Sequence, residues 1–279
     1  MIEKISVFVS DIDGTLALKG GNLQTETRKA FQRLHKEGVL IGVASGRPLD
    51  HRIINRAHEW ELGFDFDFVI GMNGGELYDK SEGVIEKYYQ LKKEDVHEIV
   101  SFLTPLPLNV IVYNQGYDDI SALHMDDFLI DSQKRNNSVV TIGDVDYVSR
   151  FDTGKIEVHV KPENMPEVMA VVNAHPSENY ICVKTFEGPN HVTIEFIDPH
   201  INKGLALRKF SEKYDIPLSE FIAFGDMEND IDLLKESGWG VCMINGSDTV
   251  KAIAQDVTEY GVTEDGVGRY LFKNWFDRQ

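Results

Sequence analysis

The sequence predicts an α/β fold: a doubly wound, Rossmann-like parallel sheet with a second, α+β domain inserted into it. Short apolar segments rich in β-branched residues alternate with amphipathic helical segments in residues 1–82 and again in residues 190–279. This alternation is typical of βαβ units. Residues 83–189, which lie between the two parts, have a different pattern and are flanked by turn-rich sequences. A length of 279 residues is compatible with two domains of ordinary size.

Five apolar segments are expected to form the strands of the core, and three amphipathic segments its helices. The strands are predicted at residues 5–9, 39–44, 68–70, 221–224 and 241–244. The helices are predicted at residues 25–37, 204–214 and 230–237. The first helix illustrates the pattern, because Ala30, Phe31 and Leu34 share one face and Gly38 follows as a stop signal.

The inserted domain is expected to mix strands and helices without the regular βαβ order. Its strand candidates lie at residues 108–113, 155–160, 180–184 and 192–196, and its helix candidates at residues 94–103 and 163–174. Turn-rich sequences at residues 79–83 and 187–190 mark its two ends. We therefore predict an inserted α+β domain at residues 83–189 and a core made of residues 1–82 and 190–279.

The composition excludes several classes of protein. Acidic residues outnumber basic residues by 46 to 28, which gives a formal net charge of −18. A chain this negative is a poor general binder of nucleic acids or of anionic membranes. Cys182 and Cys242 are far apart and form no CxxC pair, which fits a reducing compartment, so we expect a cytoplasmic protein. We see neither a signal peptide nor an apolar run of ~18 residues that could span a membrane.

Polar residues follow four of the predicted strands where each strand ends, which is where open parallel sheets bind their ligands. The four sequences are Asp11-Ile12-Asp13-Gly14-Thr15, Ser45-Gly46-Arg47, Asn73-Gly74 and Gly225-Asp226-Met227-Glu228-Asn229-Asp230. The carboxylates at positions 11, 13, 226 and 230 would form an oxygen-rich pocket of the kind that Mg²⁺ prefers. The Ser45 hydroxyl and the Lys203 ammonium would complete a binding site for a phosphoryl group.

These motifs, in this order, resemble those of the haloacid dehalogenase-like (HAD) phosphatases. DIDGT at 11–15 resembles the nucleophile motif DxDGT, ASGRP at 44–48 the second motif, INKGLAL with Lys203 the third, and GDMENDIDLL at 225–234 the fourth, GDxxND. GMNGG at 71–75 and DGV at 265–267 are similar to sequences of the Cof-type branch. The insert lies between the second and third motifs, where a C2 cap, of the C2B kind, is expected. The resemblance implies a Mg²⁺-dependent phosphatase.

Each motif residue has a chemical role to test. Asp11 is expected to be the nucleophile that forms an aspartyl-phosphate, and Asp13 the general acid and base. Asp11, the Asp13 carbonyl and Asp226 are the expected metal ligands; Asp230 either binds the metal, directly or through water, or caps a helix. Ser45 and Lys203 would bind phosphoryl oxygens. Thr15, Gly46, Asn73 and Asn229 complete the predicted phosphate or substrate set, although both asparagines are also turn formers. Arg47 either binds an anionic substrate group or forms a surface salt bridge.

The expected function is hydrolysis of a small phosphomonoester, such as a sugar phosphate or a phosphorylated cofactor, under a closing cap. Neither a nucleic acid nor a membrane is an expected partner. In the insert, Lys155, His159, Lys161, Lys184 and His191 are candidates to face the substrate. Three alternatives remain open: a phosphosugar mutase of the same fold, a non-catalytic phospho-acceptor module, and a dehalogenase or phosphonate hydrolase. Asp13 disfavours the last two, and the length of the insert counts against the phospho-acceptor module.

Overall fold

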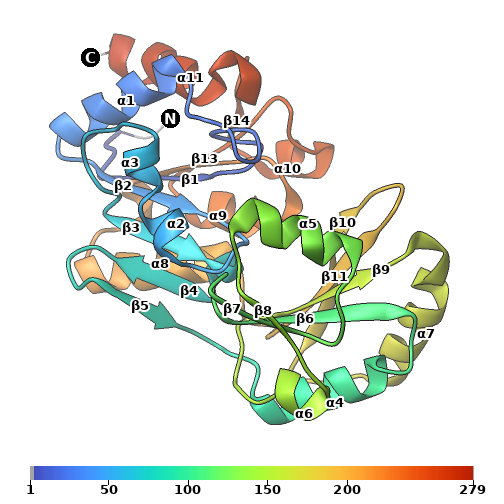
Figure 1. Ribbon diagram of the computed structural model, residues 1–279. Helices are drawn as coiled ribbons and strands as arrows, with labels where there is room; N and C mark the ends of the chain where they lie inside the picture. Colours follow the sequence, from blue (N-terminus) through green and yellow to red (C-terminus); the bar gives the residue numbers. More distant parts are fainter. Residues whose placement is uncertain (1–2, 279) are drawn as a thin grey trace. The chain divides into compact units, whose positions relative to one another are not determined.

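The computed structural model describes residues 3–278, which divide into two compact units. The core unit contains the residues up to Glu86 and those from Asn202 onward, and the inserted unit contains Lys87–Ile201, drawn mainly in green and yellow in Figure 1. The insert therefore begins and ends later than the predicted 83–189. Its C-terminal boundary shifts because the strand at 192–197 pairs with strands of the inserted unit and not with the core sheet.

The core unit is built on one eight-stranded sheet, and it confirms the predicted fold class. In spatial order the strands are β14 (Asp256–Val257), β13 (Trp239–Cys242), β12 (Phe221–Gly225), β1 (Val7–Asp11), β2 (Leu40–Ala44), β3 (Phe68–Gly71), β4 (Glu76–Asp79) and β5 (Val84–Lys87). The strands from β14 to β3 are parallel, and β4 runs antiparallel to β3. The carboxyl ends of β12, β1, β2 and β3 therefore meet at one edge of the sheet.

Helices cover both faces of this sheet, with α1 and α11 on one side and α8 and α9 on the other (Figure 1). The helices of the core unit are α1 (Thr25–Lys36), α2 (His51–Ile54), α3 (Arg56–Glu59), α8 (Lys203–Tyr214), α9 (Ile231–Glu236), α10 (Asp248–Ile253) and α11 (Gly266–Asn274). Short 3₁₀ segments are η1 (Met72–Gly74), η3 (Leu218–Glu220), η4 (Glu228–Asp230), η5 (Val262–Glu264) and η6 (Phe276–Arg278). Buried side chains of α1, including Ala30, Phe31 and Leu34, pack with Phe8 of β1 in the core.

The N-terminus of α1 is capped by a residue from the far end of the chain. Gln24 precedes the helix but makes no side-chain capping bond. Instead, the Asp265 carboxylate accepts hydrogen bonds from the backbone N–H groups of Glu26 at 2.7 Å and Thr27 at 2.8 Å, and from the Thr27 hydroxyl at 2.6 Å. A carboxylate at this end also interacts favourably with the helix dipole. The DGV sequence therefore joins α1 to the start of α11.

A buried carboxylate links β4 to α8, the helix that begins at Lys203. Asp79 accepts hydrogen bonds from the Ser81 backbone N–H at 2.8 Å and from the Tyr214 hydroxyl at 2.8 Å. The Lys213 ammonium lies 2.8 Å from the same carboxylate. Burial by itself raises the pKa of Asp79, but the bonds from Lys213, Ser81 and Tyr214 outweigh it and lower the pKa to about 2. The ionised form of Asp79 thus stabilises this part of the core.

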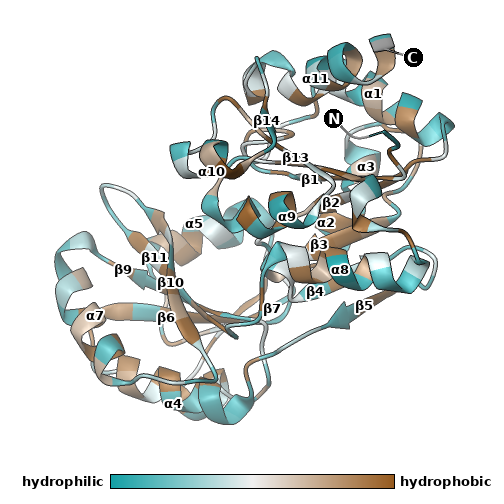
Figure 2. Ribbon diagram, turned by 180° about the vertical axis from the view of Figure 1, so that it is seen from behind, coloured by the Kyte–Doolittle hydropathy of each residue, from teal (hydrophilic) through white to brown (hydrophobic). Residues whose placement is uncertain are grey.

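The inserted unit has its own sheet and its own hydrophobic core. In spatial order its strands are β10 (Ile181–Glu187), β11 (Val192–Ile197), β9 (Ile156–Val160), β6 (Leu108–Gln115), β7 (Asp119–Ala122) and β8 (Val140–Ile142). Its helices are α4 (Lys93–Leu103), α5 (Asp127–Asn136), α6 (Val145–Val148) and α7 (Met165–Ala174), with the 3₁₀ segment η2 (Pro162–Asn164). Hydrophobic and hydrophilic residues alternate along α4 (Figure 2), whose apolar side packs with α7 against one face of the sheet.

Candidate active site

The predicted site residues lie at the carboxyl ends of neighbouring parallel strands. Strand β1 ends at Asp11, Ser45 follows β2, and Asp226 follows β12. Because β1 pairs with β12 on one side and with β2 on the other, these three positions share one edge of the sheet. The topology therefore brings together residues more than 200 positions apart in the sequence, as the strand pattern predicts.

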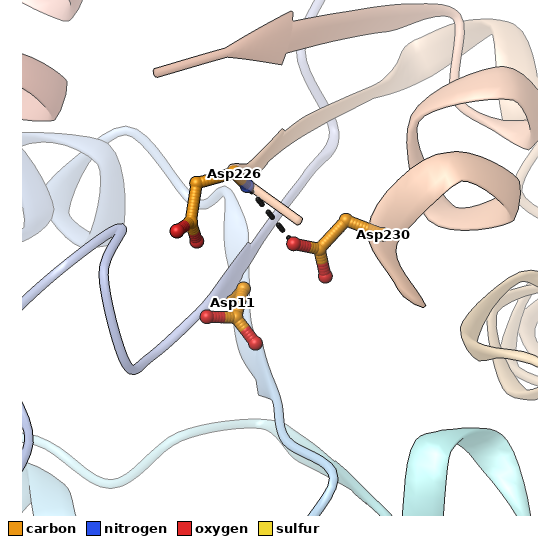
Figure 3. A group of neighbouring side chains, drawn as sticks. All are labelled: Asp11, Asp226 and Asp230. Atoms are coloured by element: carbon orange, nitrogen blue, oxygen red, sulfur yellow. Dashed lines mark hydrogen bonds between the residues drawn. The ribbon is translucent and has the colours of Figure 1, made fainter. Parts of the chain in front are cut away.

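Three aspartates form a buried acidic cluster at this edge (Figure 3). Asp11, Asp226 and Asp230 each offer one carboxylate oxygen, and these oxygens lie within 4.8 Å of one another. Lys203, the first residue of α8, is fully buried beside them. Its ammonium donates to Asp11 Oδ1 at 2.6 Å and to Asp230 Oδ1 at 2.5 Å. Three carboxylates thus share a buried space with one cation.

Asp230 fixes the turn that carries Asp226. Its Oδ2 accepts hydrogen bonds from the backbone N–H groups of Asp226 at 2.9 Å and Met227 at 3.1 Å, the first of which is the dashed line in Figure 3. Its Oδ1 is bound to Lys203. A Cβ atom on Gly225 would lie 2.5 Å from the Asp230 Cβ, so this turn requires glycine there. Both oxygens of Asp230 are therefore engaged within the protein.

The electrostatics of the cluster favour an added cation. Burial raises the pKa of Asp11, and the neighbouring carboxylates Asp230 and Asp226 raise it further, against the lowering effect of Lys203. Burial likewise raises the pKa of Asp226 to about 6. Burial alone would lower the pKa of Lys203, but Asp11 and Asp230 raise it, so the ammonium stays charged. Oxygen ligands with this excess of negative charge fit a hard divalent cation.

Asp13 lies outside this cluster and is bound to a different partner. Its Oδ2 accepts a hydrogen bond from the Arg47 guanidinium at 2.5 Å. Its Oδ1 is buried and has no hydrogen-bond partner among the described residues. The sequence left two roles open for Arg47, and the structure places it in a salt bridge inside the site.

The loop after β1 is tied to the loops after β12 and β13. The Thr15 hydroxyl donates to Asp226 Oδ1 at 2.7 Å, so its bond here is to a site carboxylate. Gly14 has a φ of +100°, and a Cβ there would lie 2.4 Å from Asp226 Oδ2. The Asn245 side chain donates to the Gly14 carbonyl at 2.8 Å. The sequence analysis missed Asn245, although a polar residue directly after the last predicted strand was a usable signal.

The second motif and the Asn73 turn form a further connected group. The Ser45 hydroxyl accepts a hydrogen bond from the Arg47 backbone N–H at 3.1 Å. Asn73 adopts a left-handed conformation with φ 54°. Its side-chain oxygen accepts from the Asn229 amide at 3.1 Å and lies 3.0 Å from where a Cβ on Gly46 would be. Both asparagines thus connect loops that leave different strands, and their predicted contacts with phosphate remain predictions.

The same turn comes into close contact with the start of α8. Gly74 has a φ of +105°. A Cβ there would lie 1.9 Å from the Asn202 carbonyl oxygen and 3.0 Å from the backbone nitrogen of Lys203. The Asn202 side chain caps α8 by accepting from the Leu205 backbone N–H at 2.9 Å. The position of Lys203 therefore depends on the absence of a side chain at Gly74.

Of the candidates in the inserted unit, two lie in a buried charged group. On one face of its sheet, the Lys155 ammonium donates to Glu195 at 2.6 Å and lies 3.5 Å from Glu157. His159 Nε2 lies 2.8 Å from Glu157, on the same strand.

The other three candidates lie outside this group. Lys184 is exposed and pairs with Glu187, and Lys161 is also exposed. His191 stacks on Phe186, with ring centroids 4.6 Å apart.

A family model described as haloacid dehalogenase-like hydrolase matches residues 8–271. This chain belongs to the haloacid dehalogenase-like hydrolases. The hydrolase is 31% identical over 270 residues to 5-amino-6-(5-phospho-D-ribitylamino)uracil phosphatase YitU of Bacillus subtilis, covering 95% of this chain and 96% of that protein. It is 26% identical over 281 residues to HMP-PP phosphatase of Cronobacter sakazakii, covering 96% and 94%.

Solved structures show the same fold. TM0651 from Thermotoga maritima matches with a TM-score of 0.82 and 23% identity over 96% of this chain and 97% of that chain. The HAD subclass IIB sugar phosphatase BT4131 matches with a TM-score of 0.76 and 22% identity over 96% and 98%. The resemblance seen in the motifs is thus confirmed, and the hydrolase is a phosphoric monoester hydrolase of this family. No helix within residues 3–278 is both long and apolar enough to cross a membrane.

Proposed function

We propose that the hydrolase cleaves small phosphomonoesters with the help of Mg²⁺, through a phosphoryl group carried transiently on Asp11. The observation that carries this proposal is the buried cluster of Asp11, Asp226 and Asp230 around the Lys203 ammonium. A carboxylate nucleophile divides a difficult displacement into two easier ones. The clustered acids supply the nucleophile and the metal ligands, and Lys203 supplies a fixed positive charge.

Asp11 and Asp226 are the side chains that would bind the metal, together with the Asp13 backbone carbonyl. Asp230 would hold the neighbouring groups in place without contacting the metal directly, because its two oxygens already bind Lys203 and the turn at Asp226. When bound, Mg²⁺ would supply positive charge that reduces the repulsion between the Asp11 carboxylate and an anionic phosphate. Thr15 would keep the Asp226 carboxylate in place through its hydrogen bond.

In the first step, an Asp11 oxygen forms a bond to phosphorus as the bond to the leaving oxygen breaks. Asp13 gives its proton to the leaving oxygen, so the alcohol departs neutral. In the second step, the ionised Asp13 takes a proton from water. The water oxygen then bonds to phosphorus as the bond to Asp11 breaks, which releases inorganic phosphate and restores Asp11. Ser45 and Lys203 would bind the phosphoryl oxygens as charge redistributes.

We propose that the substrate is a small phosphorylated metabolite and that the inserted unit selects its leaving group. Two relatives of the chain support a small phosphorylated substrate, since one is named for a phosphoribitylamino-uracil and the other for HMP-PP. The buried charged group around Lys155, Glu157 and Glu195 supports a role of the inserted unit in selecting the leaving group, because perturbed ionisable groups concentrate at functional sites. Ionised groups inside a protein otherwise bring a large desolvation cost.

Phosphate release from p-nitrophenyl phosphate tests the proposed function. Wild type, Asp11→Asn and Asp67→Asn would be compared with Mg²⁺ and after removal of divalent metal by EDTA. Asp67 is a suitable control because its carboxylate accepts a hydrogen bond from the Ile41 backbone at 2.8 Å, which an amide oxygen can also do. We expect release that requires both the metal and Asp11, with Asp67→Asn active. Metal-independent release, or an active Asp11→Asn, would contradict the proposal. Phosphoryl transfer between sugar positions without net release would favour a mutase.

A further inference from the structure

Arg47 is the charged side chain of the site that the mechanism above leaves without a role. Its guanidinium binds Asp13 Oδ2 at 2.5 Å, and the side chains of Arg47 and Asp13 are only 20% and 31% exposed. A partly buried, charge-assisted hydrogen bond of this kind restricts both groups more than an exposed ion pair does. The question is what this restriction does for Asp13.

The backbone of Arg47 is held on both sides, so the guanidinium approaches Asp13 from a fixed base. The Arg47 N–H donates to the Ser45 hydroxyl at 3.1 Å, and the Arg47 carbonyl accepts from the Met72 N–H at 2.8 Å. Met72 and Asn73 both adopt positive φ, 47° and 54°, which is uncommon for residues other than glycine. Such strained conformations persist only where the surrounding structure enforces them.

The pair leaves the two oxygens of Asp13 in different states. Oδ2 is bound to Arg47, whereas Oδ1 is buried without a hydrogen-bond partner among the residues that the structure describes. Buried polar atoms are nearly always paired in proteins, so an unpaired one in a site calls for a functional explanation. The Asp13 side chain as a whole is still 31% exposed, so a substrate can reach the carboxyl group while Arg47 holds it.

We propose that Arg47 is a positioning residue for Asp13: it holds the carboxyl group in the orientation in which that group protonates the leaving oxygen of the phosphomonoester. This inference rests on the proposed function and adds a residue to it. Arg47 itself takes no proton and forms no bond to phosphorus. Its contribution is the orientation of the carboxyl group that does protonate the leaving group.

The leaving group provides a readout that a merely structural role would not move. p-Nitrophenolate is a stable anion and leaves without a proton, whereas the alkoxide of n-hexyl phosphate must be protonated as it departs. The parameter kcat/KM reports the steps up to release of the leaving group, so it isolates the acid role of Asp13 from its later role as a base. Loss of the Arg47 side chain should therefore lower kcat/KM for the hexyl ester more than for the nitrophenyl ester.

The experiment compares kcat/KM for n-hexyl phosphate and p-nitrophenyl phosphate in wild type, Arg47→Met, Arg47→Lys and Arg52→Met. General acid catalysis contributes about 100-fold or more, so we expect Arg47→Met to lose at least about 10-fold more activity on the hexyl ester than on the nitrophenyl ester. Arg47→Lys, which keeps a positively charged donor group without the planar guanidinium, should recover part of that difference. Arg52→Met removes a comparable pair, the 2.5 Å contact with Asp50, and should leave the ratio of the two substrates unchanged.

A double variant keeps the test informative if Arg47→Met is also less stable. In an Asp13→Asn background, Arg47→Met should change the ratio of the two substrates no further, because both changes act on the same proton transfer.

Equal losses on both esters, a rise in KM alone for both, or an additive effect in the Asp13→Asn background would each overturn the inference. The proposed function fails separately, if wild type hydrolyses neither ester in the presence of Mg²⁺.

Discussion

Replacing Gly74 by alanine tests whether the start of α8 is held in place by close backbone packing. Gly74 has a φ of +105°, a conformation that costs an L-residue about 1–2 kcal/mol. The added Cβ would also lie 1.9 Å from the Asn202 carbonyl oxygen, where ordinary contact begins near 3.4 Å. One of the two segments must therefore move by about 1.5 Å. Asn202 directly precedes Lys203, so this movement reaches the ammonium that binds Asp11.

The expected effects follow from these two contributions. Overpacking of this kind typically costs about 1–3 kcal/mol. When the cost of the positive φ is added, the free energy of unfolding should fall by about 2–5 kcal/mol in total. A misplacement of about 1 Å near a reacting group can lower the rate about 100-fold. We therefore expect Gly74→Ala to lower kcat/KM for p-nitrophenyl phosphate about 100-fold.

Gly38→Ala separates the backbone effect from the steric effect. Gly38 has a similar φ, +80°, but a Cβ there would meet nothing within 4 Å. Urea unfolding followed by tryptophan fluorescence reports on the core unit, because Trp60, Trp239 and Trp275 all belong to it. Gly38→Ala should lower the free energy of unfolding by about 1–2 kcal/mol and leave the activity unchanged. If Gly74→Ala matched Gly38→Ala in both stability and activity, the argument from close packing would be wrong.

Three further substitutions probe the buried charges of the core unit. Lys203→Met should lower the free energy of unfolding by about 3–5 kcal/mol and abolish activity, because it leaves the Asp11 and Asp230 carboxylates buried without their cation. Asp265→Ala should lower it by about 2 kcal/mol with activity retained, since it removes the cap of α1. Asp79→Asn should lower it by about 2 kcal/mol at pH 7, because the pKa of Asp79 is lowered from 3.8 to about 2 in the folded protein. That difference should persist above pH 4 and disappear as the pH falls through 2.

All three are measured by urea titration, with the Asp79 pair repeated between pH 7 and pH 2. A Lys203→Met protein as stable as wild type would show that the ammonium does not offset the buried carboxylates. Loss of activity in Asp265→Ala at unchanged stability would mean that this residue acts on the site and not on α1. A difference between wild type and Asp79→Asn that stays constant with pH would contradict the lowered pKa.

The sequence was sufficient to predict the parallel core and the meeting of the candidate site residues at one edge of its sheet. Strands in βαβ units place their carboxyl ends together, so the polar residues after 5–9, 39–44 and 221–224 had to meet whatever the details of packing. The structure shows that β1 extends two residues further than predicted, to Asp11, which makes the nucleophile candidate the last residue of the strand. The prediction of Lys203 at a helix start holds as well.

Other features depend on contacts that no local pattern carries. The cap on α1 comes from Asp265, 238 positions beyond Thr27, and the close approach of Gly74 to Asn202 joins two loops. Helix α5 (Asp127–Asn136) was missed because it buries only Leu129 and Ser132, too few residues for a clear helical period. The alternation in 192–196 predicted a strand but not its partners, which is why the boundary of the insert was placed too early.

The central claim is that Asp11 carries the phosphoryl group, and a rapid-quench experiment tests it most directly. The protein would be mixed with ³²P-labelled substrate and Mg²⁺, quenched in acid within one turnover, digested, and its labelled peptide identified by mass spectrometry. We expect label on the peptide that contains Asp11 and none in Asp11→Asn. Label on another residue, or complete turnover with no labelled protein at any quench time, would contradict the claim.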